Sequence, residues 1–563
     1  MSILDTLAPT ERVLSTKPNH PKELTPQPIV LDHRLLQHPE AAPVSSLLYS
    51  GFIEHLGRCI YGGVCDDPNE PASKSLLLDQ GDYPGGTGKK RLGLRKDVLK
   101  VWGKKGDLEC PMMRYPGGNF VSNYFWKEAV GPVENRRKRR ELAWQTIESN
   151  LFGTDEFIDW CRESGCEPYL CVNMGTGSLE DALDWLEYCN GTGDTYWANE
   201  RRKNTGREEP HNVKLWGLGN EMWGTWQVGH LTADRYAEKA RRWGHALKLL
   251  DPTIQLVSCG KEGSNDWDRE VLQKCLDVID MHSIHLYSMI GYRDNALAVN
   301  YPYEANVFGP AAGERNIQNC KALIDIANVE QCANGKKPRD IKICFDEYNV
   351  WDPVVAKPTE GNEQIYTYTD MLGFCAWMNL LVRQSKDCPM ACLAQSVNDI
   401  APIICNADGI LYQSIYFPFK LFSNYMKDGH VLSMAPFKDV YDGPNHPEST
   451  QILGLRPSYI DAVAVAVTGQ NKDVSIRISL LNRHPSAQWD AVLDINSIEI
   501  NDVEIHEIFT ENLDSANTWM QPELIKPDVT KLSAKEWNEQ GAKRTLRNHS
   551  WAFIIMNGKP SSA

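Results

Sequence analysis

The chain has 563 residues, of which 42% are hydrophobic, and its formal net charge at pH 7 is −15. This length exceeds one ordinary hydrophobic core, so two domains are expected, and the acidic balance disfavours nucleic acids and anionic membrane surfaces as partners. No window approaches about 18 consecutive apolar residues, which argues against a membrane-spanning helix.

The N-terminal segment and the cysteines both bear on the cellular compartment. Residues 1–24 are polar and contain proline, so we expect a loosely held segment, and they lack the pattern of a secretory signal. The 16 cysteines are scattered, many within apolar runs such as "YLCVNMG", without paired CxxC spacing. These features predict buried free thiols, no cysteine-bound metal and a cytoplasmic location.

A single β-prone run precedes the main pattern of the chain. It is "QPIVLDHRL", within residues 25–45. We expect this strand to pair with a β-sandwich at the C-terminus.

Residues 46–428 alternate between short apolar runs and longer stretches with apolar residues at helical spacing. The successive pairs are "MMRYPGGNF" with "ELAWQTIESNLF", "EPYLCVNMGTG" with "LEDALDWLEYC", "VKLWGLGNEM" with "TADRYAEKARRWGHALKLL", "IQLVSCG" with "DREVLQKCLDVI", "DMHSIHLY" with "ERNIQNCKALIDIANVEQC", and "IKICFDEYN" with "QIYTYTDMLGFCAWMNLLVRQ". Each apolar run is short enough for a buried parallel strand, so the repeated units predict an α/β fold built on a (β/α)8 TIM barrel. A doubly wound open sheet is the alternative, weakened because "RYPGGNF" lacks the glycine spacing of a dinucleotide-binding turn.

One basic cluster, "ENRRKRREL" (Glu134 to Leu142), departs from the acidic balance. Such a cluster can be a nuclear-import or RNA-binding patch. We favour a solvated loop that leads into a helix over "ELAWQTIESN", with its charges balanced by nearby acidic residues.

The hydrophobic pattern of the sequence changes after about residue 430, from alternating strand and helix patterns to period-two alternation. "DVSIRISLLNR" places apolar residues on one face with period two, and "YIDAVAVAVTG", "VEIHEIFTEN" and "SWAFIIMNG" are similar. Residues 429–563 are therefore predicted to form an antiparallel, jelly-roll-like β-sandwich.

Functional side chains of a barrel collect where its strands end. The residues at the predicted strand ends are Glu54, Asn119, Asn173, Asn220, Glu221, His285, Tyr287, Glu347 and Gln395. No serine occupies a nucleophile elbow and no glycine-rich loop is suited to phosphate, so the chemistry rests on carboxyl and amide groups.

Glu221 and Glu347 form the strongest feature, because two facing carboxyl groups are the minimal requirement for cleaving a glycosidic bond. Glu221 lies in "LWGLGNEMWGTWQ", near Trp216, Trp223 and Trp226, and this ring-rich setting is expected to raise its pKa so that it can act as an acid. A glutamate at a strand end can equally be a salt-bridge partner, and Trp216 by itself is typical of a core residue. The spacing leaves both possibilities open.

Five motifs in matching order give the sequence a resemblance to a known family. They are "GFIEHLGRCIYGG", "MRYPGGNFVSNYFWKEAVGP", "LWGLGNEMWGTWQVGH", "CFDEYNVW" and "MACLAQSVNDIAPI", and together they resemble the α-L-arabinofuranosidases of glycoside hydrolase family 51 over roughly residues 50–425. The likeness is weaker in the C-terminal region.

The resemblance implies a retaining hydrolase that removes arabinofuranose from oligosaccharides or polysaccharides without a cofactor or metal. Glu221 would be the general acid/base and Glu347 the nucleophile, with the two carboxyl groups about 5–5.5 Å apart. The residues implied to contact the cleaved sugar are Glu54, Asn119, Asn220, Tyr287, Trp351 and Gln395. The resemblance also suggests a homo-oligomer.

Two long loops depart from a minimal barrel, Asp66 to Gly93 and Ser288 to Gly309. We expect both to shape the leaving-group side. An endo-glucanase, xylanase or galactofuranosidase on the same barrel, or a non-catalytic carbohydrate-binding protein, are the alternative functions. His282 and His285 could suggest a metal pair, but residues three apart on a strand point to opposite faces.

Overall fold

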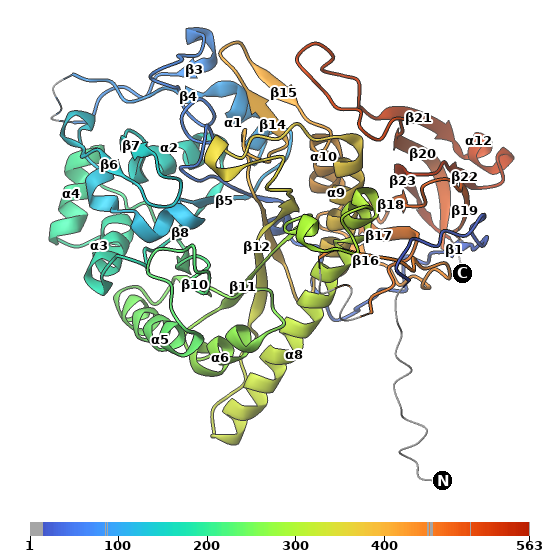
Figure 1. The fold of residues 1–563 in the computed structure, drawn as a ribbon, viewed down its shortest axis with the longest axis horizontal. Coiled ribbons are helices and arrows are strands. Elements are labelled where there is room, and N and C mark those ends of the chain that lie inside the picture. Colours follow the sequence, from blue (N-terminus) through green and yellow to red (C-terminus); the bar gives the residue numbers. More distant parts are fainter. Residues whose placement is uncertain are drawn as a thin grey trace.

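The computed structural model describes residues 15–561, apart from 85, 87, 448, 449, 451–453 and 496. Figure 1 shows a barrel with surrounding helices and a β-domain beside it, formed by the C-terminal part of the chain. In the described part of the chain, no helix combines the length and the apolar character needed to cross a bilayer.

Eight parallel strands close into the barrel. In spatial order they are β2 (Ser50–Phe52), β5 (Met112–Tyr115), β8 (Glu167–Cys171), β9 (Leu215–Leu218), β10 (Gln255–Ser258), β11 (Met281–Ser288), β12 (Lys342–Val350) and β13 (Met390–Leu393). β13 pairs with β2, which closes the sheet. The predicted (β/α)8 barrel is confirmed.

Both faces of the barrel strands are covered, which explains why they read as continuous apolar runs. Phe52, Tyr169, Leu215, Met281 and Met390 belong to one buried cluster drawn from several of these strands. A much larger buried cluster packs the helices against the strands and continues into the β-domain.

The helices lie mainly between successive barrel strands. They are α1 (Lys96–Trp102), α2 (Thr154–Ser164), α3 (Leu179–Asn190), α4 (Tyr196–Thr205), α5 (Ala233–Leu250), α6 (Asp266–Cys275), α7 (Pro302–Phe308), α8 (Ala311–Ala333), α9 (Tyr368–Arg383) and α10 (Tyr416–Tyr425). Side chains define where two of them begin: Ser178 caps α3 and Thr367 caps α9, each in a capping box with an aspartate three residues later.

The helix predicted over "ELAWQTIESN" is wrong. Residues 139–148 form a hairpin of β6 (Arg139–Arg140) and β7 (Ile147–Glu148), and the helix of this unit, α2, begins only at Thr154. The Glu141 carboxylate accepts the backbone N–H groups of Ala143, Trp144 and Thr146, and thereby stabilises a turn.

The basic cluster is balanced by acids. Arg136 is buried and forms two hydrogen bonds to the Glu156 carboxylate, of 2.9 and 3.1 Å. Arg139 pairs with Glu128. These contacts favour the structural reading of the cluster over a nucleic-acid patch.

The C-terminal domain contains two sheets and is antiparallel, as predicted, apart from one short parallel pair. The larger sheet has the order β16 (His430–Val431), β17 (Ile460–Thr468), β18 (Val474–Asn482), β23 (Ser550–Pro560), β20 (Ile498–Ile508) and β21 (Asp528–Ser533). The smaller sheet consists of β1 (Ile29–Val30), β19 (Trp489–Asp494) and β22 (Lys543–Leu546), with β1 parallel to β19.

The N-terminal segment contacts both parts of the molecule. His20 hydrogen-bonds Tyr459 of the β-domain and Glu304 of α7, and Leu24 is buried. These residues are packed rather than loosely held, and the rest of that predicted segment, residues 1–14, lies outside the described residues.

An ion-pair cluster joins the two domains. Arg383 at the end of α9 binds Glu314 of α8 and Asp461 of β17, the latter at 2.7 Å. We propose residues 46–428 and 429–563 as the limits of the two domains, since β16, the first strand of the larger sheet, begins at His430.

Candidate active site

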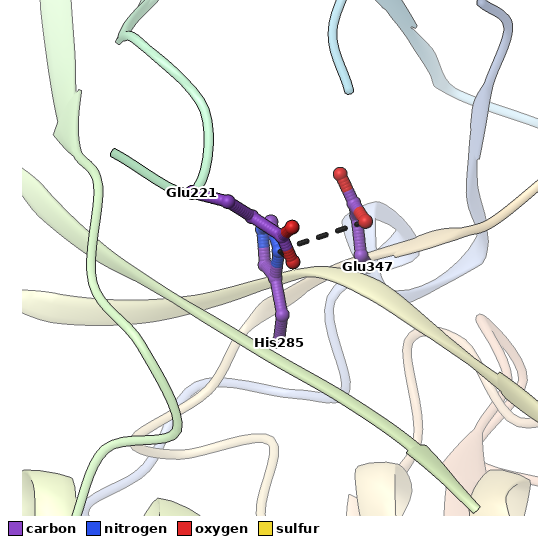
Figure 2. Close-up of side chains that lie close together, drawn as sticks. All are labelled: Glu221, His285 and Glu347. Atoms are coloured by element: carbon purple, nitrogen blue, oxygen red, sulfur yellow. Dashed lines mark hydrogen bonds and ion pairs between the residues drawn. The ribbon is translucent and has the colours of Figure 1, made fainter. Parts of the chain in front are cut away.

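Glu221 and Glu347 converge at the carboxyl end of the barrel. Glu221 follows β9 and Glu347 lies on β12, with His285 of β11 between them (Figure 2). One oxygen of each carboxyl group and one nitrogen of His285 lie within 4.8 Å of one another. The two acids are therefore close enough to act on one bond.

Both oxygens of Glu347 are held by donors. Arg114 Nη1 donates to Oε1 at 2.7 Å, and the Tyr287 hydroxyl donates to Oε2 at 2.8 Å. The side chain of Glu347 is 7% exposed. Its carboxylate is thus fixed in one orientation with little access to bulk water.

Glu221 is held differently. Its backbone is left-handed, with φ of +42°, directly after the turn that ends β9. His285 Nδ1 contacts Oε1 at 3.0 Å, and Trp226 Nε1 donates to Oε2 at 3.1 Å.

His285 links Glu221 to a second buried acid, Asp346. Its Nε2 lies 3.0 Å from Asp346 Oδ1. Burial lowers the pKa of His285, but the Glu347 carboxylate and the bonds to Asp346 and Glu221 outweigh burial and raise this pKa to about 10. Burial raises the pKa of Asp346, but Arg114 and His285 outweigh it and hold this pKa below its ordinary value. These contacts favour the protonated form of His285, with Nε2 directed at Asp346 and Nδ1 at Glu221.

We expect His285→Gln to destabilise the fold most below about pH 6.5 and progressively less towards pH 10. A folded pKa above the unfolded value of about 6.5 stabilises the protein fully below pH 6.5, and this stabilisation is lost as pH rises through the folded value. Urea denaturation at about pH 6 and pH 9.5, with His245→Gln on the exposed side of α5 as control, measures the difference. A deficit that is equal at both pH values contradicts the assigned charge.

Arg114 connects the site from beneath. It is 1% exposed, and besides Glu347 it donates through Nη2 to Asn220 Oδ1 at 2.7 Å. Asn220 Nδ2 in turn donates to Asn119 Oδ1 at 3.3 Å. The buried Arg114 guanidinium thus binds both Glu347 and Asn220, the residue next to Glu221, and fixes their relative positions.

Glu54 lies on the opposite side of the site, 2% exposed. It accepts hydrogen bonds from the backbone N–H of Phe120, from Trp144 Nε1 at 3.1 Å and from Gln395 Nε2 at 3.2 Å. Burial and the charge of Glu347 raise the pKa of Glu54 well above its usual value. Gly118 is required here, because a Cβ would come 2.0 Å from Glu54 Oε2 at a φ of +66°.

These side chains open into a cavity of about 470 Å³. The sequence-predicted residues that line it are Glu54, Asn119, Glu221, His285, Tyr287, Glu347, Trp351 and Gln395. Asn220 is 1% exposed and does not line the cavity. Asn173 lies outside it, where its side chain caps the turn at Thr176.

The two long loops differ in their contribution. Ile290 of the second loop lines the cavity, whereas no described residue of the first loop does. Tyr83 of the first loop instead contacts Arg136 and Glu156. The described residues of this loop therefore give no support to the expectation that it shapes the leaving-group side, and Ala143 and Trp144 of the β6–β7 hairpin line the cavity instead.

The three tryptophans near Glu221 have separate roles. Trp216 is fully buried and packs edge-to-face on Trp185. Trp223 donates to the Gly260 carbonyl. Only the hydrogen bond from Trp226 reaches the Glu221 carboxyl, and it does so through the polar N–H rather than an apolar ring face.

Sequence reasoning missed Arg114, Asp346 and Trp144. Arg114 sits inside an apolar strand run, and a charged residue there is the one signal that could have identified it. Asp346 directly precedes Glu347, and Trp144 lies in the region assigned to a helix. Neither residue carries a local signal of its position.

The described residues offer one group that could ligate a metal ion, namely Glu221, His285 and Glu347. The two histidines of "HSIH" do not converge, since His282 contacts Asp268 and Ser258 instead. Both ring nitrogens of His285 are within hydrogen-bond distance of a carboxylate oxygen, Nδ1 of Glu221 and Nε2 of Asp346.

Paired carboxyl groups at the carboxyl end of a (β/α)8 barrel, in a cavity walled by aromatic rings, define a glycoside hydrolase. Two family models match the chain, the alpha-L-arabinofuranosidase 1 domain over residues 105–297 and the alpha-L-arabinofuranosidase C-terminal domain over residues 346–550. Alpha-L-arabinofuranosidase C of Emericella nidulans is 42% identical over 528 residues, covering 90% of this chain and 94% of that protein. The chain therefore belongs to the α-L-arabinofuranosidases of glycoside hydrolase family 51.

Solved structures agree with this assignment. The family 51 α-L-arabinofuranosidase of Bifidobacterium longum superimposes with a TM-score of 0.79 at 30% identity, covering 94% of this chain and all of that one. The Thermotoga maritima α-L-arabinofuranosidase in its arabinose complex gives a TM-score of 0.76 at 32% identity, covering 94% and 99% of the two chains.

A further sequence relative is an intracellular exo-α-(1→5)-L-arabinofuranosidase of Acetivibrio thermocellus, which is 34% identical over 462 residues, covering 78% of this chain and 85% of that protein.

Proposed function

We propose that this protein is a retaining, exo-acting α-L-arabinofuranosidase that releases terminal non-reducing arabinofuranose from saccharides derived from arabinan or arabinoxylan. The observation that carries this proposal is the close approach of Glu221 and Glu347 inside one cavity. Carboxyl groups this near leave no room for a water molecule between the second carboxylate and the anomeric carbon, so that carboxylate is placed to attack the sugar directly.

Glu347 is the proposed nucleophile. Arg114 and Tyr287 hold its carboxylate in place, so that an oxygen can bond to the anomeric carbon as the glycosidic bond breaks. Glu221 donates its proton to the departing oxygen. In the second step Glu221 takes a proton from water, which attacks the anomeric carbon and frees Glu347, so the configuration of arabinose is preserved.

The remaining lining residues are proposed to bind the sugar hydroxyls. Gln395 Oε1 is buried and has no hydrogen-bond partner among the described residues, so it can accept from a hydroxyl. Glu54, Asn119 and Tyr287 face the same space, and Trp351 packs edge-on against Tyr287 as a wall. Asn220, which does not line the cavity, is proposed to act on the sugar through Asn119, to which its Nδ2 donates.

We also propose a cytoplasmic location, with short saccharides as substrates. All 16 cysteines are free and 15 of them are buried, which suits a reducing compartment. The relative from Acetivibrio thermocellus is named as an intracellular enzyme. Homo-oligomerisation stays a prediction.

Covalent trapping tests the proposal directly. An activated arabinofuranoside with fluorine in place of its 2-hydroxyl should form an ester at Glu347 that persists long enough for peptide mapping by mass spectrometry. Glu347→Gln should remain unlabelled under the same conditions. A label on another residue contradicts the assignment, and no label with the arabinofuranoside but a label with a pyranoside analogue contradicts the substrate class.

A further inference from the structure

Trp226 combines two properties that a structural tryptophan does not need. It is 56% exposed, although an indole is among the largest apolar side chains, and it lines the cavity. Its N–H donates to Glu221 Oε2 at 3.1 Å. One side chain therefore presents open ring surface while it contacts the proposed acid.

Two contacts, besides the hydrogen bond to Glu221, fix the orientation of this ring. Trp226 packs over the backbone of Gly224, where a Cβ would come 2.6 Å from the indole. Trp223 meets it edge-to-face, with ring centroids 5.0 Å apart. Trp223 is itself anchored to the Gly260 carbonyl. The exposed part of the indole is thus preorganised rather than free to rotate.

The surroundings of Trp226 define the chemistry that fits there. Leu286 and Ile290 add apolar lining, and Glu262 is the nearby acid. Lys261 lies over the Trp223 ring, 5.1 Å from its centroid, and its Nζ is 3.7 Å from Glu262 Oε1, so the charge of Glu262 is balanced. The open indole face of Trp226 beside this apolar lining favours a flat sugar ring.

We propose that Trp226 is the platform for the leaving group and the residue that positions Glu221 towards it. This inference rests on the proposed acid role of Glu221. A leaving-group sugar stacked on the indole brings its glycosidic oxygen towards the carboxyl that the same indole holds by its N–H. Binding of the leaving group and delivery of the proton are coupled through one side chain.

Two substitutions separate the two roles. Trp226→Phe keeps an aromatic face and removes the N–H, whereas Trp226→Ala removes both. We compare kcat/KM, which reports the first chemical step, on an arabinofuranosyl-xylose disaccharide and on 2,4-dinitrophenyl arabinofuranoside, whose leaving group needs no proton. Trp519→Ala, at the exposed Trp519 of the β-domain, is the matched control.

On the disaccharide, Trp226→Phe should lower kcat on the order of tenfold, with KM within about twofold of the wild-type value. On the dinitrophenyl substrate, its kcat/KM should change by less than about threefold. Trp226→Ala should add a roughly threefold to tenfold rise in KM for the disaccharide. Equal losses of Trp226→Phe on both substrates, or none on either, would overturn the positioning role.

The failure of this inference is distinguishable from a failure of the proposed function. Glu221→Gln is measured beside the Trp226 variants on both substrates. If Glu221→Gln loses activity on the disaccharide alone and Trp226→Phe behaves as wild type, only the inference about Trp226 is wrong. If Glu221→Gln shows no dependence on the leaving group, the acid role itself is wrong.

Discussion

Replacing Glu347 by glutamine is expected to lower kcat/KM roughly 10⁵-fold on every arabinofuranoside, activated or not. The amide cannot form the glycosyl ester, and the other cavity carboxyls do not substitute for it. Glu221 is engaged by His285 and Trp226, and Glu54 carries three donors on the far side. Hydrolysis rates measured on aryl and disaccharide substrates check the loss.

A matched control separates chemistry from stability. Glu156 is another buried glutamate paired with an arginine, Arg136, and it does not line the cavity. Glu156→Gln removes the carboxylate paired with the buried Arg136, at a cost of about 3–5 kcal/mol, whereas Arg114 keeps Asp346 3.4 Å from its Nε, so Glu347→Gln should destabilise the fold less. Only Glu347→Gln should lose activity per folded molecule. Comparable activity losses in both variants would assign Glu347 a structural role.

Azide sharpens the assignment further. In Glu347→Gly the small anion can take the place of the missing carboxylate, attack the anomeric carbon from the same side and displace the leaving group once. The product should be the azide of inverted configuration, which NMR identifies. A product with retained configuration would show that another group still forms the covalent intermediate.

The placement of the candidate site was predictable because it depends on a general property of parallel barrels. All strands point the same way, so residues at their carboxyl ends meet at one rim regardless of their separation in sequence. Glu54, Tyr287, Glu347 and Gln395 come from β2, β11, β12 and β13 or the turns after them, and all four line one cavity.

The groups beneath that rim were not predictable in the same way. Arg114 lies within β5 and reaches Glu347 across the barrel interior, a contact that depends on which strands face each other. Asp346 adjoins Glu347 and contacts Tyr169 and Ser283, while Arg114 and His285 contact both acids, because the pairing of β12 shifts register here and simple alternation fails. A one-dimensional pattern identifies the face of a residue but not its partner.

The hairpin at residues 139–148 shows where local pattern was misleading. "ELAWQTIESN" has apolar residues at helical spacing, but Gln145 adopts a left-handed φ of +64°. The Glu141 carboxylate also accepts hydrogen bonds from the backbone N–H groups of Trp144 and Thr146 and so holds them in a turn. The hydrogen bonds of the Glu141 side chain to the backbone favour the hairpin over a helix and bring Trp144 to Glu54. A segment that the sequence pattern predicted as a helix therefore lines the cavity.

Replacing Glu221 by alanine should produce a different pattern from the loss of Glu347. On a disaccharide, kcat/KM should fall about 10³- to 10⁴-fold, because the departing sugar oxygen must leave without a proton. On 2,4-dinitrophenyl arabinofuranoside it should hardly change, since that anion leaves unaided, while kcat and KM should fall together as the glycosyl ester accumulates on Glu347.

The accumulation follows from the second half of the reaction, in which Glu221 has to take a proton from water. Azide needs no such base, so it should restore kcat of Glu221→Ala on the dinitrophenyl substrate and yield the azide of retained configuration, opposite to that from Glu347→Gly. One oxygen of each carboxyl group lies within 4.8 Å of the other. Despite this closeness, the azides from the two variants should differ in configuration, because Glu347 acts as nucleophile and Glu221 as acid/base. If both variants gave the same azide, or if Glu221→Ala lost both substrates equally, Glu221 would not be the acid/base.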